Sequence, residues 1–408
     1  MIVVTWVISM LAHNFHGCTI AQDGLHGWAV TLDRAAVDTL PIVRTCDGGM
    51  TWTRQQRPVA WQLFDVTCTD AYRAWACGMQ GVILSTEDGG LSWRIESHGH
   101  VKYYTRIQML DTLHGFAAGG DGMVGKKVGT SWQRIQITQC YQTDFYGLCF
   151  LDTASGWLCG RPSIEAGGRY SHIVYTEDGG NSWILLWEDT TYDFLDIWFV
   201  DSVEGWVVGG NPNSYEPLIW HTTDGGLNWE PQVCPTGSYY LRAVEFINKD
   251  TGWAVGMFGT ILKTTDGGMT WSLQTSVAES TLFDVEFADA YHGIAVGNGW
   301  LLYTYDGGEH WYEGVVVGIN EHSIEPEIVI PNPFMKQLTM RVNSCNNLKL
   351  IVYDMVGRSI YEAEPQYMDG YIVWDGTNNS GVEVSPGTYI CILYRDDVKT
   401  LYKVVKLK

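Results

Sequence analysis

Apolar and polar residues alternate with a period of two through much of residues 17–318. In 282–287, Phe283, Val285 and Phe287 fall on one side and two acidic residues on the other, which predicts a β-strand with one buried face. Turns rich in Gly, Asn and Asp separate such segments, and four of them follow one another at 282–287, 294–296, 300–304 and 310–316. No stretch has the 3.6-residue period of a long amphipathic helix. The pattern predicts an all-β protein made of four-stranded units.

The four-stranded unit recurs with a phrase, Thr-x-Asp-Gly-Gly-x-polar-Trp, which we call the box. Its six intact copies contain Asp47 and Trp52, Asp88 and Trp93, Asp178 and Trp183, Asp224 and Trp229, Asp266 and Trp271, and Asp306 and Trp311. A degraded seventh copy ends at Trp132 and has Lys127-Val128-Gly129 in place of Asp-Gly-Gly. The copies lie about 40 residues apart, and a second phrase containing Gly-Trp, clearest at 150–157 and 199–206, precedes most of them. Seven such periods predict a seven-bladed β-propeller at residues 17–318.

The box suits the hairpin between the third and fourth strands of a blade. Gly adopts positive φ without steric cost, and an Asp side chain can accept hydrogen bonds from nearby backbone N–H groups. We therefore expect the Asp and Trp residues of the box to be structural. The degraded copy should still form a blade, but with a looser hairpin, because Lys127 cannot form an Asp-centred turn.

The box resembles the Asp-box (BNR) repeat. Together with the Gly-Trp phrase, it looks most like photosystem II assembly factors of the Ycf48/HCF136 kind. This resemblance implies a propeller fold but leaves the function open, because sialidases, xyloglucan hydrolases, sortilin-like receptors and assembly factors all use Asp-box propellers.

A second module is expected at residues 327–408, after a linker at 319–326. Short alternating strands separated by Gly, Pro and Asn turns predict a small β-sandwich. Pro-Asn-Pro at 331–333, Trp-Asp-Gly at 374–376, Pro-Gly-x-Tyr at 386–389 and a basic tail resemble the type A C-terminal sorting domain of the type IX (Por) secretion system. The resemblance implies a Bacteroidota-type envelope, recognition of this module by the secretion machinery, and a secreted or outer-membrane-surface location.

Composition excludes some classes of partner. The formal net charge of −21 argues against nucleic-acid binding, which requires a basic face. No apolar run is long enough to predict a membrane span. Residues 1–16 are either an atypical signal segment, since no Lys or Arg precedes the apolar stretch 1–12, or an extra strand that closes the ring.

The ten cysteines allow two interpretations. Cys149 and Cys159 flank one hairpin turn and could pair, but position 159 belongs to a column of core residues, where a free thiol packs like a small apolar side chain. We expect buried thiols. No Cys-x-x-Cys pair occurs and the His residues are scattered, so we expect no metal site and no cofactor.

Candidate binding residues gather on one face of the expected propeller. The long loops 31–40, 161–170 and 211–217 map to the face opposite the box hairpins. So do the aromatic residues Tyr103, Tyr104, Tyr141, Tyr146, Tyr192, Tyr239 and Tyr240. Variable loops with amphipathic aromatic residues suggest a surface that binds a protein or glycan. The alternative is that many of these rings pack between blades.

Other candidates lie in the central channel, which the first strand of each blade lines. The expected channel-facing residues are Asp65, Arg106, Gln108, Asp196, Arg242, Glu245, Asp284 and Glu286. Of these, Arg106, Asp196, Arg242 and Asp284 are candidate ligand contacts. The alternative is a hydrated pore without a ligand.

Catalysis is not expected. A sialidase needs three Arg residues around the substrate carboxylate, and only Arg106 and Arg242 occur in the first-strand column. A xyloglucan hydrolase places paired Asp residues between two propellers, and this chain has length for one. The sequence therefore predicts a secreted or cell-surface propeller that binds a protein or polysaccharide. The alternatives are a glycoside hydrolase and a Ycf48-like assembly factor, although the acidity of this chain disfavours the basic patch of that group.

Overall fold

A computed structural model describes residues 13–32, 42–59, 61–99, 101–165, 167–317, 329–330, 338–341, 348–354, 358–363, 371–395 and 398–406. The chain divides into two compact units, Met1–Ile319 and Asn320–Lys408. Residues 1–12 of the candidate signal segment, the linker 319–326 and most of the loop 31–40 lie outside the described residues.

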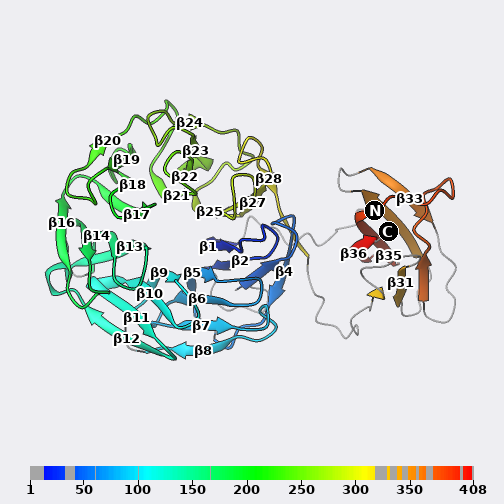
Figure 1. The fold of residues 1–408 in the computed structure, drawn as a ribbon, viewed down its shortest axis with the longest axis horizontal. Helices are drawn as coiled ribbons and strands as arrows, with labels where there is room; N and C mark the ends of the chain where they lie inside the picture. The colour runs from blue at the N-terminus through cyan, green and yellow to red at the C-terminus, as the bar shows by residue number, and fades with distance from the viewer. Residues whose placement is uncertain are drawn as a thin grey trace, which may run out of the picture. The chain divides into compact units, whose positions relative to one another are not determined.

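The first unit is a ring of seven sheets around a central axis, and each sheet contains four antiparallel strands (Figure 1). The first blade contains β1 (Phe15–Ile20), β2 (Gly27–Thr31), β3 (Ile42–Thr45) and β4 (Thr51–Gln55). The second contains β5 (Leu63–Cys68), β6 (Ala74–Gly78), β7 (Ile83–Thr86) and β8 (Arg94–Ser97). The third contains β9 (Tyr104–Met109), β10 (His114–Gly119), β11 (Met123–Val128) and β12 (Ser131–Gln136). The next two contain β13 (Thr143–Phe150), β14 (Gly156–Pro162), β15 (Ser171–Thr176) and β16 (Ile184–Asp189); and β17 (Asp193–Phe199), β18 (Gly205–Gly210), β19 (Pro217–Thr222) and β20 (Glu230–Pro231).

The last two sheets contain β21 (Leu241–Phe246), β22 (Gly252–Gly256), β23 (Ile261–Thr264) and β24 (Ser272–Leu273); and β25 (Leu282–Phe287), β26 (Gly293–Gly297), β27 (Trp300–Thr304) and β28 (Tyr312–Glu313). Short 3₁₀ turns η2 (Gly120–Gly122), η3 (Thr138–Cys140) and η4 (Met257–Gly259) lie between strands. The predicted all-β, seven-bladed propeller is confirmed. Among the described residues no helix is long and apolar enough to cross a membrane.

The segment 310–316, which the pattern assigned to one strand, is divided in the structure. β28 ends at Glu313, and β29 (Val315–Val317) pairs in parallel with β4 of the first blade. A parallel partner at the outer edge of another blade leaves no periodic signal in the sequence. β29 therefore links the end of the seventh blade to the first.

A bulge interrupts the first strand of every blade. The extra residues are His16, Phe64, Thr105, Tyr146, Leu195, Arg242 and Phe283. Each bulge shifts the alternation by one residue, so Leu282, not Phe283, shares the core with Val285 and Phe287. The sequence-based grouping of Phe283 with those two residues was wrong for this reason.

Each intact box forms a closed hydrogen-bonded turn. In the sixth blade, the Thr264 hydroxyl donates to Asp266 Oδ1 at 2.9 Å and accepts the Gly268 N–H at 2.8 Å. The other bonds to this carboxylate come from the N–H of Thr270 at 2.8 Å and from its hydroxyl at 2.6 Å. These bonds lower the pKa of Asp266.

The box is also tied to the turn that carries the Gly-Trp phrase. In the sixth blade the Gly267 N–H donates to the Asp250 carbonyl at 2.9 Å. Equivalent bonds join Gly48 to Leu25, Gly89 to Tyr72, Gly179 to Ala154, Gly225 to Val203 and Gly307 to Tyr291. The two repeated phrases therefore form one structural unit on the same face of a blade.

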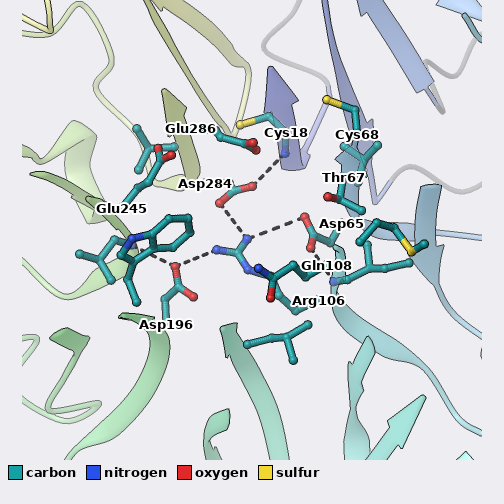
Figure 2. A pocket seen from close by; sticks show the side chains of 17 residues that line it. Cys18, Asp65, Thr67, Cys68, Arg106, Gln108, Asp196, Glu245, Asp284 and Glu286 are labelled. Carbon is teal, nitrogen blue, oxygen red and sulfur yellow. Dashed lines mark hydrogen bonds and ion pairs between the residues drawn. The ribbon is translucent and has the colours of Figure 1, made fainter. Parts of the chain in front are cut away.

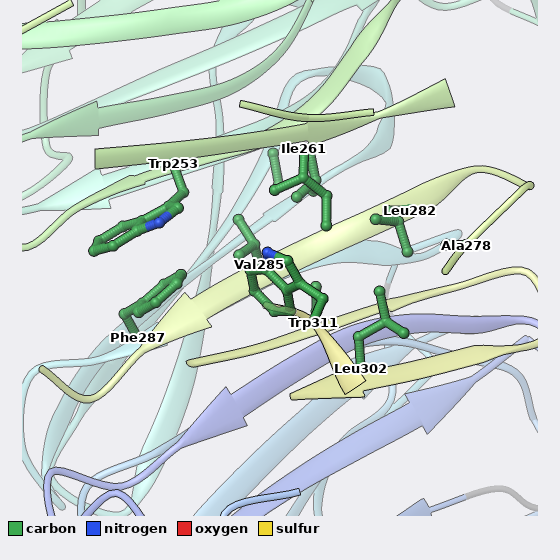
Figure 3. Close-up of a cluster of buried hydrophobic side chains, with 11 residues drawn as sticks. Trp253, Ile261, Ala278, Leu282, Val285, Phe287, Leu302 and Trp311 are labelled. Atoms are coloured by element: carbon green, nitrogen blue, oxygen red, sulfur yellow. The ribbon is translucent and has the colours of Figure 1, made fainter. Parts of the chain in front are cut away.

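Trp residues of both repeated phrases pack between neighbouring blades. Trp253 of the sixth blade stacks on Phe287 of the seventh at 3.5 Å between ring centroids, and Trp311 meets the edge of the same ring at 5.9 Å (Figure 3). Similar three-ring sets occur at Trp157, Phe199 and Trp229 and at Trp206, Phe246 and Trp271. Each repeat thus contributes rings to the packing of its neighbour.

The degraded box of the third blade forms a different hairpin. β11 and β12 pair without a bulge from Met123 opposite Gln136 to Val128 opposite Ser131, and Gly129 turns the chain at φ 65°. The expectation of a looser hairpin is wrong, because the strands continue to a two-residue turn once the larger box turn is absent.

Lys127, in the box Asp position, is buried and forms an ion pair with the buried side chain of Glu96 from the second blade. The ammonium also lies 5.7 Å from the ring centroids of Trp75 and Trp132. Trp132 Nε1–H donates to Glu96 Oε2 at 2.9 Å. The substitution that degrades the box therefore creates a polar link between two blades.

The second unit contains two sheets around one core. One consists of β30 (Val329–Ile330), β31 (Leu338–Arg341) and β34 (Tyr371–Trp374), and the other of β32 (Leu348–Asp354), β33 (Ser359–Ala363), β35 (Gly387–Arg395) and β36 (Val398–Lys406). Leu338 and Trp374 of the first sheet share a buried cluster with Leu350 and Cys391 of the second. A core between two sheets is the arrangement of a β-sandwich.

Candidate functional site

Two faces of the propeller differ in what they present. We call the face built by the connections between blades and by the turns between second and third strands the loop face. The opposite face carries the box hairpins and is called the hairpin face. Every predicted aromatic candidate belongs to a segment of the loop face or to the start of a first strand beneath it.

The aromatic candidates are divided between surface and core. Tyr141 and Tyr239 are exposed, with 57% and 42% of their surface accessible. The half-buried candidates are Tyr103, Tyr146 and Tyr192. The buried candidates are Tyr104, which packs with Trp75 and Cys77, and Tyr240, whose hydroxyl donates to Asp193 Oδ2 at 2.7 Å. Packing between elements therefore accounts for several of the rings.

Bulge residues lie around the mouth of the channel on the loop face. The His16 ring stacks on Phe283 at 4.9 Å and meets Phe64 edge-on at 5.5 Å, and burial lowers the pKa of His16 to about 4. The Arg242 guanidinium lies over Tyr240 at 5.2 Å and over Phe283 at 5.5 Å. The expectation that Arg242 joins the channel carboxylates is wrong, because the bulge places Ala243 in that register.

The central channel contains Arg106, a predicted ligand contact, which lies among three carboxylates. Its guanidinium lies 2.8 Å from Asp284 Oδ1, 2.7 Å from Asp196 Oδ2 and 3.8 Å from Asp65 Oδ1 (Figure 2). A cavity of about 230 Å³ adjoins this cluster, with Glu245 and Glu286 on its wall. The structure therefore brings together three of the four channel candidates.

The same carboxylates bond the backbone of the following blade. Asp65 accepts the Ile107 N–H at 2.8 Å, Asp196 the Val244 N–H at 3.0 Å, and Asp284 the Cys18 N–H at 2.9 Å. Gln108 forms an equivalent bond with the Phe150 N–H and Glu245 with the Phe287 N–H. These side chains join neighbouring first strands across the ring, a role that the sequence analysis did not identify.

Negative charge exceeds positive charge in this cavity. Burial is the main cause that raises the pKa of Asp65 to about 7 and of Asp196 to about 6, against the opposing effect of Arg106. Burial and the neighbouring carboxylates raise the pKa of Glu245 and Glu286 well above the usual range. Some of these carboxyl groups therefore carry protons near neutral pH.

A groove of about 540 Å³ lies on the loop face between the second, third and fourth blades. Val101, Tyr103 and Tyr141 provide apolar surface in it. Lys102 lies there between Asp121 Oδ2 at 2.8 Å and Glu165 Oε2 at 3.1 Å. A concave site with aromatic walls and a few polar groups is suited to ligand binding.

Two exposed aromatic residues on the loop face, Tyr215 and Phe258, were not among the predicted binding residues, and 50% and 57% of their surface is accessible. Both have positive φ, as do Gln80 and Asp121 in other turns of this face. The Gly of Phe258-Gly259, like that of Gln80-Gly81, predicts a turn from the sequence. The aromatic residue before this Gly could therefore have been recognised as part of a surface turn. Tyr215 lies within the predicted loop 211–217 but was not named as a binding residue, and Phe258 lies in the short turn between β22 and β23.

No group of three or more His, Cys, Asp or Glu side chains in the described ranges is arranged to hold a metal ion. The nine described cysteines are free thiols, including Cys149 and Cys159. Burial raises the pKa of the Cys149 thiol to about 12. The two cysteines do not lie opposite each other, because Cys149 pairs with Trp157 and Cys159 with Gly147.

Comparison with known proteins relates the propeller to one group. Residues 175–278 match the family described as photosynthesis system II assembly factor YCF48. The photosystem II assembly lipoprotein Ycf48 of Synechococcus sp. (strain CC9902) is 28% identical over 204 residues, which cover 47% of this chain and 56% of that protein. The chain thus spans only about half the length of this relative.

Solved structures give the same result for the fold. YCF48 bound to D1 peptide superposes with a TM-score of 0.57 at 20% identity, over 72% of this chain and 94% of that one. YCF48 from Cyanidioschyzon merolae gives 0.57 at 18% identity, over 72% and 96%. The predicted resemblance of the repeats to Ycf48 is confirmed, whereas the resemblance of 327–408 to a sorting domain stays a prediction.

Proposed function

We propose that this protein is an exported, surface-exposed propeller that binds a segment of a partner protein on its loop face. The observation that carries this proposal is the groove of about 540 Å³, which collects Tyr103 and Tyr141 from separate connections between blades. Its length across several blades suits an extended segment, because each connection can contribute one contact.

The groove offers both apolar and polar contacts. Tyr141 is exposed at its edge, and Val101 is partly covered. The Lys102 side chain is 52% exposed although its ammonium bonds to Asp121 and Glu165. Replacement of one of these carboxylates by a group of the ligand therefore requires little desolvation. Amphipathic rings beside exchangeable ion pairs are typical of protein interfaces.

A relative with the same fold supports a peptide ligand. The solved YCF48 structure contains a D1 peptide bound to that protein. The identity of this chain to it is 20%, so we carry over only the general idea of a peptide on a propeller. A basic patch would select an acidic ligand. The net charge of −21 indicates that the ligand of this chain has a different charge.

A non-catalytic role is supported by the engagement of the channel carboxylates. A glycoside hydrolase needs one carboxylic acid and one carboxylate free to act on either side of the scissile bond. Asp65, Asp196 and Asp284 each contact Arg106 and a backbone N–H of the next blade. We therefore propose that these groups stabilise the ring.

The binding proposal is tested with the full chain and arrays of peptides and glycans. Tyr141→Ala and Val101→Arg should weaken binding of selected peptides by about tenfold or more, since they remove or block apolar contacts in the groove. Tyr72→Ala, on the hairpin face with 64% of its surface exposed, is the matched control. Binding to glycans alone, or turnover of glycoside substrates, would refute the proposal.

We also propose that residues 327–408 direct export through the type IX machinery. The support is the sequence resemblance together with a second unit that has its own core. Deletion of 321–408 should leave a folded propeller that accumulates in the periplasm, and fusion of this segment behind a signal peptide and an inert reporter should export the reporter. Normal secretion of the truncated protein would contradict this assignment.

A further inference from the structure

Three exposed aromatic residues of the fifth and sixth blades form a second feature of the loop face. We call Tyr215, Tyr239 and Phe258 the aromatic patch. The rings of Tyr239 and Phe258 meet edge to face, with centroids 4.8 Å apart and planes at 71°. About half of the surface of each of the three residues is accessible. They come from two turns and one connection that are distant in sequence.

Two members of the patch have an unfavourable backbone conformation. Tyr215 has φ 59° and Phe258 has φ 55°. Bulky residues rarely adopt this left-handed region, where Gly or Asn would fit with less strain. Gln80 and Asp121 adopt the same conformation in other turns of this face, so the turn sets the backbone, whereas an exposed ring at such a position gains little from burial.

A hydrogen-bond network fixes the backbone under the patch. The Tyr240 N–H donates to the Tyr215 carbonyl at 3.0 Å, and the Met257 N–H donates to the Tyr240 carbonyl at 3.0 Å. The Gly259 N–H donates to the Ser280 carbonyl at 2.7 Å, which ties the next connection to the same turn. The aromatic rings are thus presented by a preorganised backbone, which reduces the entropy lost on binding.

The segments nearest the patch carry negative charge, whereas the guanidinium of Arg242, which follows one of them, already lies over the rings of Tyr240 and Phe283. The segments that surround it, 211–217, 233–241, 257–260 and 275–281, contain no Lys, Arg or His. They contain two acidic residues, Glu216 and Glu279, both exposed. Aromatic faces beside carboxylates attract cations through both the ring quadrupole and the Coulomb interaction.

We infer that the aromatic patch binds a Lys or Arg side chain of an extended, cationic segment in the partner protein. This inference rests on the proposed function, since it assigns the charge of the ligand to the same loop face. The molecule already uses this contact within the fold, because the guanidinium groups of Arg161 and Arg242 lie 4.9 Å and 5.2 Å from the ring centroids of Tyr146 and Tyr240. At the patch, the cation would come from the partner.

The test uses the full chain and three fluorescent peptides in which Gly alternates with Lys, Gln or Glu. The Lys peptide should bind at least about tenfold more tightly than the Gln peptide, and the difference should shrink at high ionic strength. Phe258→Gly should reduce affinity for the Lys peptide by about tenfold, while the midpoint of thermal unfolding stays the same or rises, because Gly has no strain at φ 55°.

The Phe258→Gly variant has the same net charge as the parent. The substitution therefore does not change the non-specific attraction of a cationic peptide to the acidic protein as a whole. Tyr239→Ala should lower affinity similarly, and Glu216→Gln with Glu279→Gln should reduce the salt dependence. Tyr72→Ala on the hairpin face should change nothing. Equal affinity of the parent and Phe258→Gly for the Lys peptide would overturn the inference.

The outcomes separate this inference from the proposed function. If the array peptides that bind the parent are neutral or acidic and Tyr141→Ala weakens them, the loop face still binds protein segments and only the cationic assignment falls. If only glycans bind, both proposals fall. Tight binding of the Lys peptide that Phe258→Gly and Tyr239→Ala both abolish would support the two together.

Discussion

Replacement of Lys127 by Met should destabilise the propeller strongly at neutral pH. The Lys127 and Glu96 side chains are only 3% and 7% exposed, so the change leaves this carboxylate, inside the interface of two blades, with only the exposed Arg94 at 3.4 Å as a cation. Breaking a buried ion pair typically costs about 3–5 kcal/mol of unfolding free energy. The indole N–H groups of Trp75 and Trp132 still reach Glu96, at 3.3 Å and 2.9 Å, so we expect the lower end of this range, about 3 kcal/mol.

The assay is thermal and urea unfolding followed by far-UV circular dichroism. A loss of about 3 kcal/mol should lower the melting temperature of a unit of this size by roughly 5 °C. Arg94→Met is the matched control, because Arg94 contacts the same carboxylate at 3.4 Å from a side chain that is 63% exposed, and should cost about 1 kcal/mol or less. Glu96→Gln in the Lys127→Met background should restore part of the lost stability.

The pH dependence of this effect has a definite sign. Burial opposes ionisation of Glu96, but hydrogen bonds from Lys127 and Trp132 outweigh it and lower the pKa. The stabilisation is therefore complete above the unfolded pKa of about 4.3 and is lost as the pH falls through the folded value. The difference between parent and Lys127→Met should shrink in acid. A loss no larger than that of Arg94→Met at neutral pH would refute the reasoning.

Two further predictions concern the repeats and the channel. Trp271→Ala should lower the unfolding free energy by roughly 3–5 kcal/mol, since the indole is 6% exposed, whereas Met269→Ala, at 81% exposure, should change it by about 0.5 kcal/mol or less in urea titrations. The raised pKa values of Asp65, about 7, and Asp196, about 6, mean that the folded chain binds more protons than the unfolded chain above about pH 4. The melting temperature should therefore fall from pH 5 to pH 8, and Asp65→Asn should flatten that slope; a melting temperature that rises over this interval would contradict the protonated channel.

The number of blades and the position of each box hairpin could be predicted from the sequence because both depend on local chemistry. The Asp of the box bonds to residues within four positions of itself, as Asp266 does with Thr264 and Thr270. The Gly pair supplies positive φ in the same turn. Interactions of such short range repeat with the sequence, so their period reveals the architecture.

The contents of the channel could be predicted only in part. Arg106, Asp196 and Asp284 follow the alternation and meet as expected. Arg242 does not, because it is the extra residue of a bulge, which places Ala243 in the register of the channel carboxylates. Alternation within one segment does not show where such a bulge occurs.

Partners from other blades were decided by the tertiary structure alone. The pair of Lys127 with Glu96, and of β29 with β4, joins segments whose sequences give no sign of one another. The same holds for Tyr215, Tyr239 and Phe258, which become one patch only when hydrogen bonds bring their turns together. Local patterns therefore determined how each blade folds, whereas closure of the ring determined which side chains meet, because contact between distant segments depends on geometry that no single repeat contains.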